Sequence, residues 1–174
     1  MGQTFLHSMV AFRRPKNLSD ILIKAQVPPT PQKIPRGQLK RIKACNAKQC
    51  QTCPYVKTGK NFKSLFNSTV MQLNSALSCA STNVVYCLLC LKENCQQIYI
   101  GQTKRQVKER FGEHKTSVRS NSKCAVAEHF DGHLLHDMQI LALEKVFTPG
   151  ILEKRESLYI NMLEAEYSGL NRKQ

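Results

Sequence analysis

A run of prolines limits what the first part of this chain can fold into. Pro28, Pro29, Pro31 and Pro35 fall within the stretch VPPTPQKIPRG. Each proline fixes its own φ angle and lacks a backbone N–H donor, so we expect an extended linker here and not packed structure. A short amphipathic helix is expected just before it, in FRRPKNLSDILIKA. The 174 residues then leave room for one domain of ordinary size after this arm.

The positive charge of the chain is concentrated in its first 80 residues. These hold 13 Lys or Arg and one acid, Asp20, whereas residues 81–174 hold 13 Lys or Arg and 11 acids. A basic excess of this kind binds phosphate backbones without reading base sequence, so we expect residues 1–80 to bind a polyanion such as a nucleic acid. A merely soluble basic tail is the alternative.

No apolar run reaches the roughly 20 residues of a membrane span, so an intracellular location is expected. The basic clusters RRPK and KRIK favour the nucleus.

Eight cysteines in an intracellular chain favour metal binding over disulfides. Cys45, Cys50 and Cys53 form C-x4-C-x2-C, and Cys79 follows just before the first expected strand. Four thiolates make a closed tetrahedral zinc site, which can order a segment too polar to bury a core of its own. We therefore predict a zinc-binding linker over residues 44–80, with unliganded cysteines as the alternative.

From Asn83 onward the pattern changes to alternating strands and helices. NVVYCLLC and QQIYIGQT are β-rich segments on either side of the turn-like LKEN, which predicts a hairpin. A helix should follow, with Thr103 and Gln106 as a capping box, and a second helix should begin near Ala125.

The last third of the chain adds one strand and one helix. MQILALEKV reads as the strand, and Thr148–Pro149 as the N-cap and first residue of a helix that runs to about Leu163. The whole order predicts an α+β fold over residues 81–174, in which a small three-stranded antiparallel sheet is flanked by helices.

Polar groups lie on or beside the apolar stripes of two expected helices. Arg110 lies beside the apolar stripe of the first helix, and His114 belongs to that stripe. The alternatives without a functional role are a surface arginine at 110 and a core histidine at 114. Glu156 falls inside the stripe of the last helix, where an unpaired carboxylate is costly to bury. A divalent ion, Mg²⁺ or Mn²⁺, would compensate this charge, and an ion pair with a Lys or Arg is the alternative.

A second metal set is expected around the hairpin. Cys90 and Cys95 lie between its strands, and His129 and His133 have the spacing H-x3-H, which places both on one face if the helix continues that far. These four residues predict a Cys2His2 zinc site that ties the hairpin to the second helix. Other ligands stay open, and Cys124 has no assignment. The alternatives are Cys87 in place of Cys90, and His136 or His114 in place of one of the other ligands.

Val84-Val85-Tyr86 and Tyr99-Ile100-Gly101 resemble the two halves of the signature of the GIY-YIG endonucleases. The first half departs from the family at two positions, since Val84 and Val85 replace Gly and Ile. The later polar residues follow the order found in the family: Arg110, His114, Glu156 and Asn171. The resemblance implies the GIY-YIG nuclease fold, preceded by the extended zinc-binding linker.

A closer resemblance covers most of the chain from about Ala11. FRRPKNLSDILIKA, CNAKQCQTCP, SALSCASTNVVYCLLC, YIGQTKRQVKERFGEH, AEHF and LEKRESLYI are similar to the C-terminal end of a Penelope-like retroelement polyprotein, in which the nuclease follows a reverse transcriptase. Residues 1–43 then resemble the tail of that polymerase, which is itself absent, so no polymerase activity is expected. A reverse transcriptase acting in trans becomes an expected partner.

The resemblance also implies roles for the site residues. Tyr86 would deprotonate the attacking water, Tyr99 would position it, and Arg110 would hold the scissile phosphate. Glu156 would bind the single catalytic metal, and His114 and Asn171 would be further polar contacts. The expected function is a DNA endonuclease that nicks one strand to prime reverse transcription. The alternative is an inactive zinc-dependent nucleic-acid-binding remnant, which the altered first half of the signature favours.

Overall fold

The computed structural model describes residues 42–45, 47–59, 61–63, 70–72, 76–95, 97–148, 150–166 and 169–171. By its internal contacts the chain divides into residues 1–33 and residues 34–174, and every described residue belongs to the second unit. The predicted amphipathic helix and proline-rich linker therefore lie outside the described residues. Within the described part of the chain, no helix has the length and apolar character needed to cross a membrane.

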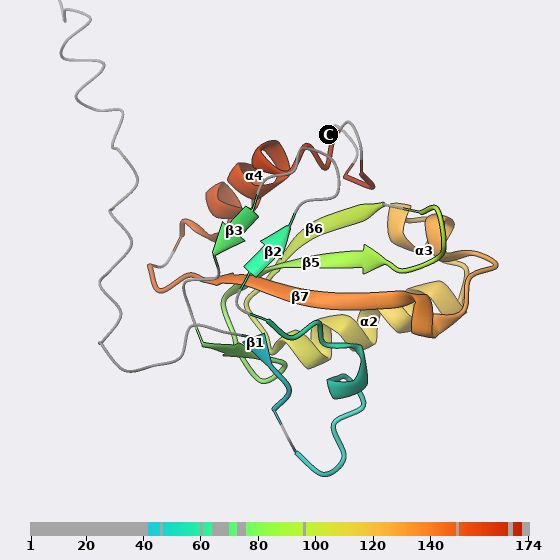
Figure 1. Ribbon diagram of the computed structural model, residues 1–174, viewed down its shortest axis with the longest axis horizontal. Helices are drawn as coiled ribbons and strands as arrows, with labels where there is room; N and C mark the ends of the chain where they lie inside the picture. Colours follow the sequence, from blue (N-terminus) through green and yellow to red (C-terminus); the bar gives the residue numbers. More distant parts are fainter. Residues whose placement is uncertain are drawn as a thin grey trace, which may run out of the picture. The chain divides into compact units, whose positions relative to one another are not determined.

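A three-stranded antiparallel sheet, in the order β6-β5-β7, underlies the described part of residues 81–174. β5 (Val84–Cys90) pairs with β6 (Ile98–Thr103) on one side and with β7 (Met138–Lys145) on the other. Figure 1 shows the three strands side by side with the helices around them. All seven residues of β5 are buried, because the central strand has a neighbour on each edge and cover on both faces.

Helices follow the strands in the predicted order. α2 (Val107–Arg119) and α3 (Ala125–Phe130) come after the β5–β6 hairpin, and α4 (Leu152–Met162) comes after β7. A single 3₁₀ turn, η2 (Leu135–Asp137), leads into β7. The predicted α+β fold, with a small antiparallel sheet flanked by helices, is confirmed.

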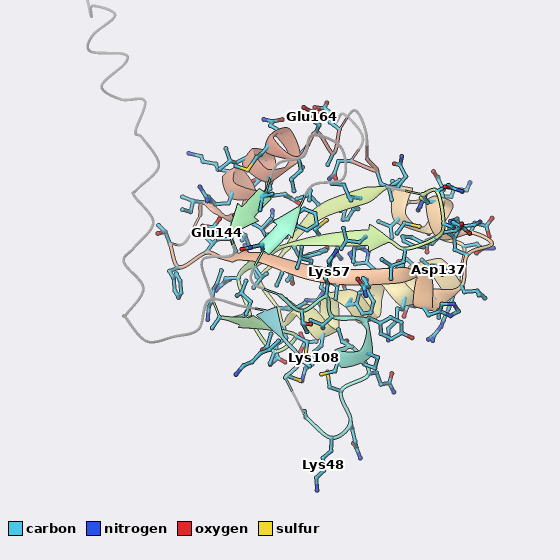
Figure 2. The ribbon with its side chains drawn as sticks, viewed as in Figure 1. Lys48, Lys57, Lys108, Asp137, Glu144 and Glu164 are labelled. Atoms are coloured by element: carbon cyan, nitrogen blue, oxygen red, sulfur yellow. The ribbon has the colours of Figure 1, made fainter. Side chains whose placement is uncertain are left out.

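The cysteine-rich segment before the sheet holds short strands of its own. These are β1 (Ile42–Lys43) parallel to β4 (Leu77–Ser78), β2 (Asn61–Lys63) antiparallel to β3 (Val70–Gln72), and the 3₁₀ turn η1 (Cys53–Tyr55). Val56 forms a parallel bridge with Ile140, and the N–H of Lys57 donates to the Ile140 carbonyl at 2.9 Å. The segment thus adds to the free edge of β7, while Lys48 lies at the tip of a loop that projects away from the sheet (Figure 2).

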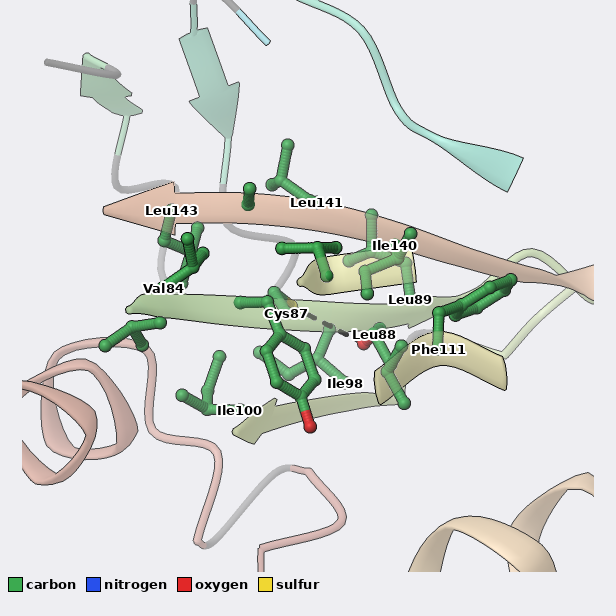
Figure 3. Close-up of a cluster of buried hydrophobic side chains, with 14 of the residues drawn as sticks. Val84, Cys87, Leu88, Leu89, Ile98, Ile100, Phe111, Ile140, Leu141 and Leu143 are labelled. Atoms are coloured by element: carbon green, nitrogen blue, oxygen red, sulfur yellow. Dashed lines mark hydrogen bonds between the residues drawn. The ribbon is translucent and has the colours of Figure 1, made fainter. Parts of the chain in front are cut away.

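The core is built from the apolar faces of the sheet and of α2. Cys87, Leu88 and Ile140 lie among other apolar side chains of the three strands, and Phe111 reaches them from α2 (Figure 3). The predicted apolar stripe of α2 is confirmed, since its members are all buried: Val107, Phe111, His114 and Val118. Burial of this stripe fixes the rotation of α2 about its own axis and hence the direction of Arg110.

Both helix starts that the capping patterns predicted are wrong. The N-cap of α2 is Gln106, and the Thr103 hydroxyl accepts the N–H of Arg105 at 3.1 Å instead, because Thr103 is the last residue of β6. α4 begins at Leu152 and not after Thr148. Gly150 has a φ of +80°, a left-handed conformation that a right-handed helix does not include, so the helix starts only after it.

Candidate active site and metal centres

A cavity of about 800 Å³ lies against β6, α2, α3 and α4. Five of the six residues that the GIY-YIG resemblance singled out line it: Tyr99, Arg110, His114, Glu156 and Asn171. The sixth, Tyr86 on β5, has no exposed surface and joins the group through hydrogen bonds. The fold therefore brings all six together from four separate elements and the segment after α4.

Tyr86 is the centre of a buried hydrogen-bond network. Its hydroxyl lies 2.7 Å from Nε2 of His114 and accepts a hydrogen bond of 3.0 Å from Nε of Arg110. Burial, and then the charge of Arg110, lower the pKa of His114 to about 4, so its ring is neutral near pH 7. A neutral ring that accepts at Nε2 leaves the Tyr86 proton pointing at His114, which carries its own proton on Nδ1. The network joins the Tyr86 hydroxyl to a neutral imidazole nitrogen, while burial raises the pKa of Tyr86 above its ordinary value and keeps its proton in place.

Tyr86 and Tyr99 can lie close together because Gly101, which lies between them, has no side chain. Gly101 is the residue of β6 opposite Tyr86 in the strand register. A Cβ at this position would lie 2.6 Å from the Tyr86 hydroxyl and 2.9 Å from the Tyr99 ring, which is closer than real Cβ atoms come. The glycine of the second signature half thus leaves the room in which both rings pack beside the His114 ring, at centroid distances of 5.7 Å each.

Arg110 is held by partners on two sides. Besides its bond to Tyr86, its Nη1 forms a 2.8 Å ion pair with Glu113, which also pairs with Arg105. Burial alone would lower the pKa of Arg110, but Tyr86 and Glu113 raise it above its ordinary value, so the guanidinium keeps its charge. These bonds use Nε and Nη1, and Tyr99 is a further hydrogen-bond partner of the guanidinium, so part of the five-donor fork is left for a phosphate.

Glu156 projects from α4 toward the same cavity. It is half-buried within the stripe of Leu152, Tyr159 and Leu163, which are all buried. Burial raises the pKa of its carboxyl group, and the amide of Gln102, which donates to Glu156 at 3.1 Å, opposes that rise. Among the described residues, no Lys or Arg forms an ion pair with it, so the alternative of a simple ion pair is not what the structure shows.

The chemistry of this wall fits a single divalent cation. A half-buried carboxylate with one amide donor keeps a free oxygen toward a polar cavity, and Mg²⁺ is commonly held by one or two carboxylates plus waters and substrate phosphates. Glu153 also lines the cavity, and its charge raises the pKa of Glu156 further. A bound cation would relieve that repulsion.

Asn171 acts on the backbone of β6. Its Oδ1 accepts the N–H of Ile100 and its Nδ2 donates to the Ile100 carbonyl, both at 2.8 Å. The side-chain amide thus pairs with the edge strand as another strand would, directly between Tyr99 and Gly101. This residue therefore holds the signature strand in place, whereas the sequence predicted only a further polar contact at the site.

Two residues that hold candidate site residues in place were not predicted from the sequence. Gln102 orients Glu156, and Glu113 pairs with Arg110. Glu113 carried a signal, since it follows Arg110 by three positions on an expected helix, where side chains are neighbours. Gln102 carried none, because its partner lies 54 positions away in the chain.

The four N-terminal cysteines form a tight group. All four sulfur atoms of Cys45, Cys50, Cys53 and Cys79 lie within 4.8 Å of one another. Three Sγ–Sγ distances are 3.5 Å, and a tetrahedral zinc with Zn–S bonds of about 2.3 Å places its sulfurs about 3.8 Å apart. Burial raises the pKa of the Cys79 thiol, so a cation is needed to hold it as a thiolate. The group fits a structural zinc ion.

A second group joins the hairpin to the end of α3. The ligand atoms of Cys90, His129 and His133 lie within 4.8 Å of one another, and Sγ of Cys95 is 3.5 Å from Nε2 of His129. α3 ends at Phe130, so the helix does not continue as far as the shared helical face would need, and a turn brings His133 beside His129 instead. Nδ1 of His133 lies 3.3 Å from the carbonyl of Asp131, which leaves Nε2 for a metal.

The alternative ligands lie elsewhere. Cys87 is fully buried in the core, where its thiol contacts the Leu88 carbonyl at 3.4 Å, and His114 is bonded to Tyr86. His136 is mostly exposed and approaches Asp137. Cys124, which had no assignment, is exposed and lies on the wall of the active-site cavity.

Comparisons with known proteins identify a matching family, a similar protein and a similar solved structure. A family model described as the GIY-YIG catalytic domain matches residues 82–171. Uncharacterized protein 019R of Invertebrate iridescent virus 6 is 32% identical over 77 residues, which cover 43% of this chain and 26% of that protein, so the chain spans about a quarter of this relative. The solved catalytic domain of homing endonuclease I-TevI is similar with a TM-score of 0.45 and 18% identity, over 52% of this chain and 98% of that one.

Proposed function

Because this chain belongs to the GIY-YIG catalytic-domain family, we propose that it is a metal-dependent DNA endonuclease that nicks one strand of its substrate. The observation that carries the proposal is the convergence of a tyrosine pair, an arginine, a neutral histidine and a half-buried carboxylate on one cavity. Phosphodiester hydrolysis needs a positioned water, a proton acceptor and positive charge around the phosphate. The cavity offers a group for each need.

On the α2 side, the residues handle the phosphate and the proton. Arg110 binds the scissile phosphate with the free N–H groups of its guanidinium fork. Tyr86 is the base that takes the proton of the attacking water, and Nε2 of His114 receives the proton that Tyr86 gives up. Tyr99, which lines the cavity, positions the water.

On the α4 side, Glu156 holds the metal. A bound Mg²⁺ or Mn²⁺ supplies charge neutralisation for the phosphate and the leaving oxygen. Gln102 keeps one carboxylate oxygen of Glu156 fixed, so that the other faces the cavity. One carboxylate with one supporting amide is the basis for proposing a single catalytic ion.

Zinc at the two cysteine-containing groups has a structural role in this proposal. The basic residues of the first 80 positions supply most of the affinity for the DNA backbone. The resemblance to Penelope-like retroelements supports a nick that primes reverse transcription, with the polymerase supplied in trans, and a nuclear location.

A plasmid assay tests the enzymatic proposal. Supercoiled plasmid is incubated with purified protein and Mg²⁺, with EDTA, and with the Glu156→Ala variant. We expect open-circle product from the wild type with Mg²⁺ and none in the other two reactions. If the wild type binds DNA but yields no open circles, the chain is the inactive remnant that Val84 and Val85 in the first signature half favour.

Zinc content is a separate measurement. We expect about two zinc ions per chain, one for each group. Loss of one ion in Cys50→Ser and of the other in His133→Ala assigns them, whereas a content near zero in the wild type contradicts both sites.

A further inference from the structure

The first turn of α2 receives its capping hydrogen bonds from the cysteine-rich segment. Its N-cap residue, Gln106, forms no side-chain capping bond within the described part of the chain. Instead, the N–H of Val107 donates to the Ser81 carbonyl at 3.0 Å, and the N–H of Lys108 donates to the Cys79 carbonyl at 2.8 Å. The first N–H groups of a helix have no partner inside it, so these two carbonyls replace the usual capping side chain.

Cys79 connects this cap to the four-cysteine group. Its carbonyl accepts from Lys108, while its buried sulfur lies 3.5 Å from the sulfurs of both Cys50 and Cys53. One residue therefore provides a ligand atom to the candidate zinc site and a capping atom to α2. Any change that releases the Cys79 sulfur also frees the carbonyl that holds the helix.

The side of α2 is fastened to the same segment. Thr52, between two of the cysteines, is buried, and its hydroxyl approaches the Lys108 carbonyl at 3.4 Å. The Tyr55 ring packs on the Phe111 ring at a centroid distance of 5.3 Å, and Nζ of Lys115 lies 5.1 Å above Tyr55. The segment thus contacts α2 at its first turn and again along the next two turns.

We propose that the four-cysteine centre is the anchor of the catalytic helix, so that its metal occupancy determines whether Arg110 and His114 reach Tyr86. The inference rests on the proposed nuclease function. Arg110 follows the capped Lys108 by two positions, and its bond to Tyr86 is 3.0 Å long, so a small shift of the first turn breaks it. A misplacement of 1 Å in a catalytic constellation can cost about 100-fold in rate.

Metal binding is what makes this anchor firm. Thiol groups are weak hydrogen-bond donors, and a polar segment with little apolar core of its own gains its order from the ion. Without the ion, we expect the loop of Cys45, Cys50 and Cys53 to separate from Cys79 and the first turn of α2 to open. This role differs from a DNA-binding arm, whose loss would weaken substrate affinity and leave the bound complex able to react.

The test uses the full chain and three variants. Cys50→Ser removes one sulfur of the anchor, Thr52→Val removes only the hydroxyl that contacts Lys108, and Cys95→Ser removes a sulfur from the other centre as the matched control. For each we measure zinc per chain, amide hydrogen exchange along α2, and the kcat and KM of plasmid nicking at saturating Mg²⁺.

Cys50→Ser is expected to lose about one zinc and to speed exchange at the first turn of α2 by about tenfold or more, with kcat lowered about 10- to 100-fold. Thr52→Val should keep its zinc and show a smaller change in the same two readouts. Cys95→Ser should leave exchange at this turn as in the wild type.

Unchanged exchange at the first turn of α2 in Cys50→Ser overturns the proposal, as does a rise in KM with kcat intact. If Cys50→Ser also exposes the amides of β5 to exchange, that variant is unfolded and Thr52→Val becomes the deciding test. Exchange rates and a kcat equal to those of the wild type in Thr52→Val would then overturn the proposal that the four-cysteine centre anchors α2. If the wild type does not nick DNA, the proposed function fails, yet the exchange measurements still decide whether the centre holds α2.

Discussion

The two walls of the active-site cavity are built differently. On the α2 wall, Arg110 and His114 are both hydrogen-bonded to Tyr86, at 3.0 and 2.7 Å, and the pKa shifts keep the arginine charged and the histidine neutral. On the α4 wall, Glu156 has one amide donor, Gln102, and faces the cavity with a pKa raised by burial.

The α2 wall consists of groups that the folded protein holds in place by itself, whereas the α4 wall contains a group that needs a bound ligand to be held in place. The α2 wall satisfies its buried polar atoms internally, so we expect it to be formed before DNA or metal binds. The α4 wall holds a carboxylate whose charge is poorly compensated, so its order depends on a cation. Substitutions on the α2 wall should therefore change rate and stability together, and those on the α4 wall should change metal dependence.

Tyr86→Phe should have the largest effect. It removes the base and leaves Nε of Arg110 and Nε2 of His114 without their partner, so we expect single-turnover nicking to fall about 10²- to 10⁴-fold and the free energy of unfolding to fall by about 1–3 kcal/mol. Tyr159→Phe, at a buried tyrosine outside the cavity, is the matched control and should keep its nicking rate. Wild-type nicking by Tyr86→Phe would remove this residue from the mechanism.

The buried neutral histidine predicts a pH dependence of stability. His114 has a pKa of about 4 in the folded chain and an ordinary value of 6.5, so below pH 6.5 only the unfolded chain takes up the proton. Stability from this residue is complete above pH 6.5 and falls as pH decreases toward 4, by roughly 2 kcal/mol between pH 6.5 and pH 5. Urea unfolding of His114→Gln should lack this part of the slope, whereas the exposed control His136→Gln should keep it. Equal slopes for the wild type and His114→Gln contradict a neutral His114.

Gln102→Leu tests the metal wall. Without the amide that holds Glu156, the concentration of Mg²⁺ for half-maximal nicking should rise about 10- to 100-fold, while the rate at saturating Mg²⁺ recovers in large part. Gln139→Leu on β7 is the matched substitution away from the cavity. An unchanged Mg²⁺ titration for Gln102→Leu would show that Glu156 is oriented without it.

Asn171→Ala should have the smallest effect. It removes two hydrogen bonds to the backbone of Ile100, each worth about 1 kcal/mol, so chemical denaturation should show a loss of about 1–2 kcal/mol. Nicking should fall less than tenfold, because the catalytic groups keep their own bonds. A loss of activity without a loss of stability would mean that Asn171 contacts the substrate instead.

The local sequence pattern was enough to predict which helices and strands form, but not the residues at which the helices begin. The hairpin of β5 and β6 follows from two β-rich segments on either side of the turn-like LKEN, and the buried stripe of α2 follows from its helical period of 3.6 residues. The starts of α2 and α4 did not follow, since carbonyls of Cys79 and Ser81 cap the first and Gly150 delays the second. When backbone carbonyls from a distant part of the chain cap a helix, the residues near the helix start give no signal of it.

The sequence by itself identified the candidate site residues: a tyrosine on each of two paired strands, an arginine and a carboxylate at the edge of or within apolar stripes, and cysteines at metal-ligand spacing. Only the tertiary structure decided how they act on one another. It buried Tyr86 between Arg110 and His114, placed Gln102 against Glu156, and put the Cys79 carbonyl on the end of α2. The physical reason is that residue type fixes charge and donor groups, whereas pKa, orientation and capping depend on neighbours that the fold brings from far along the chain.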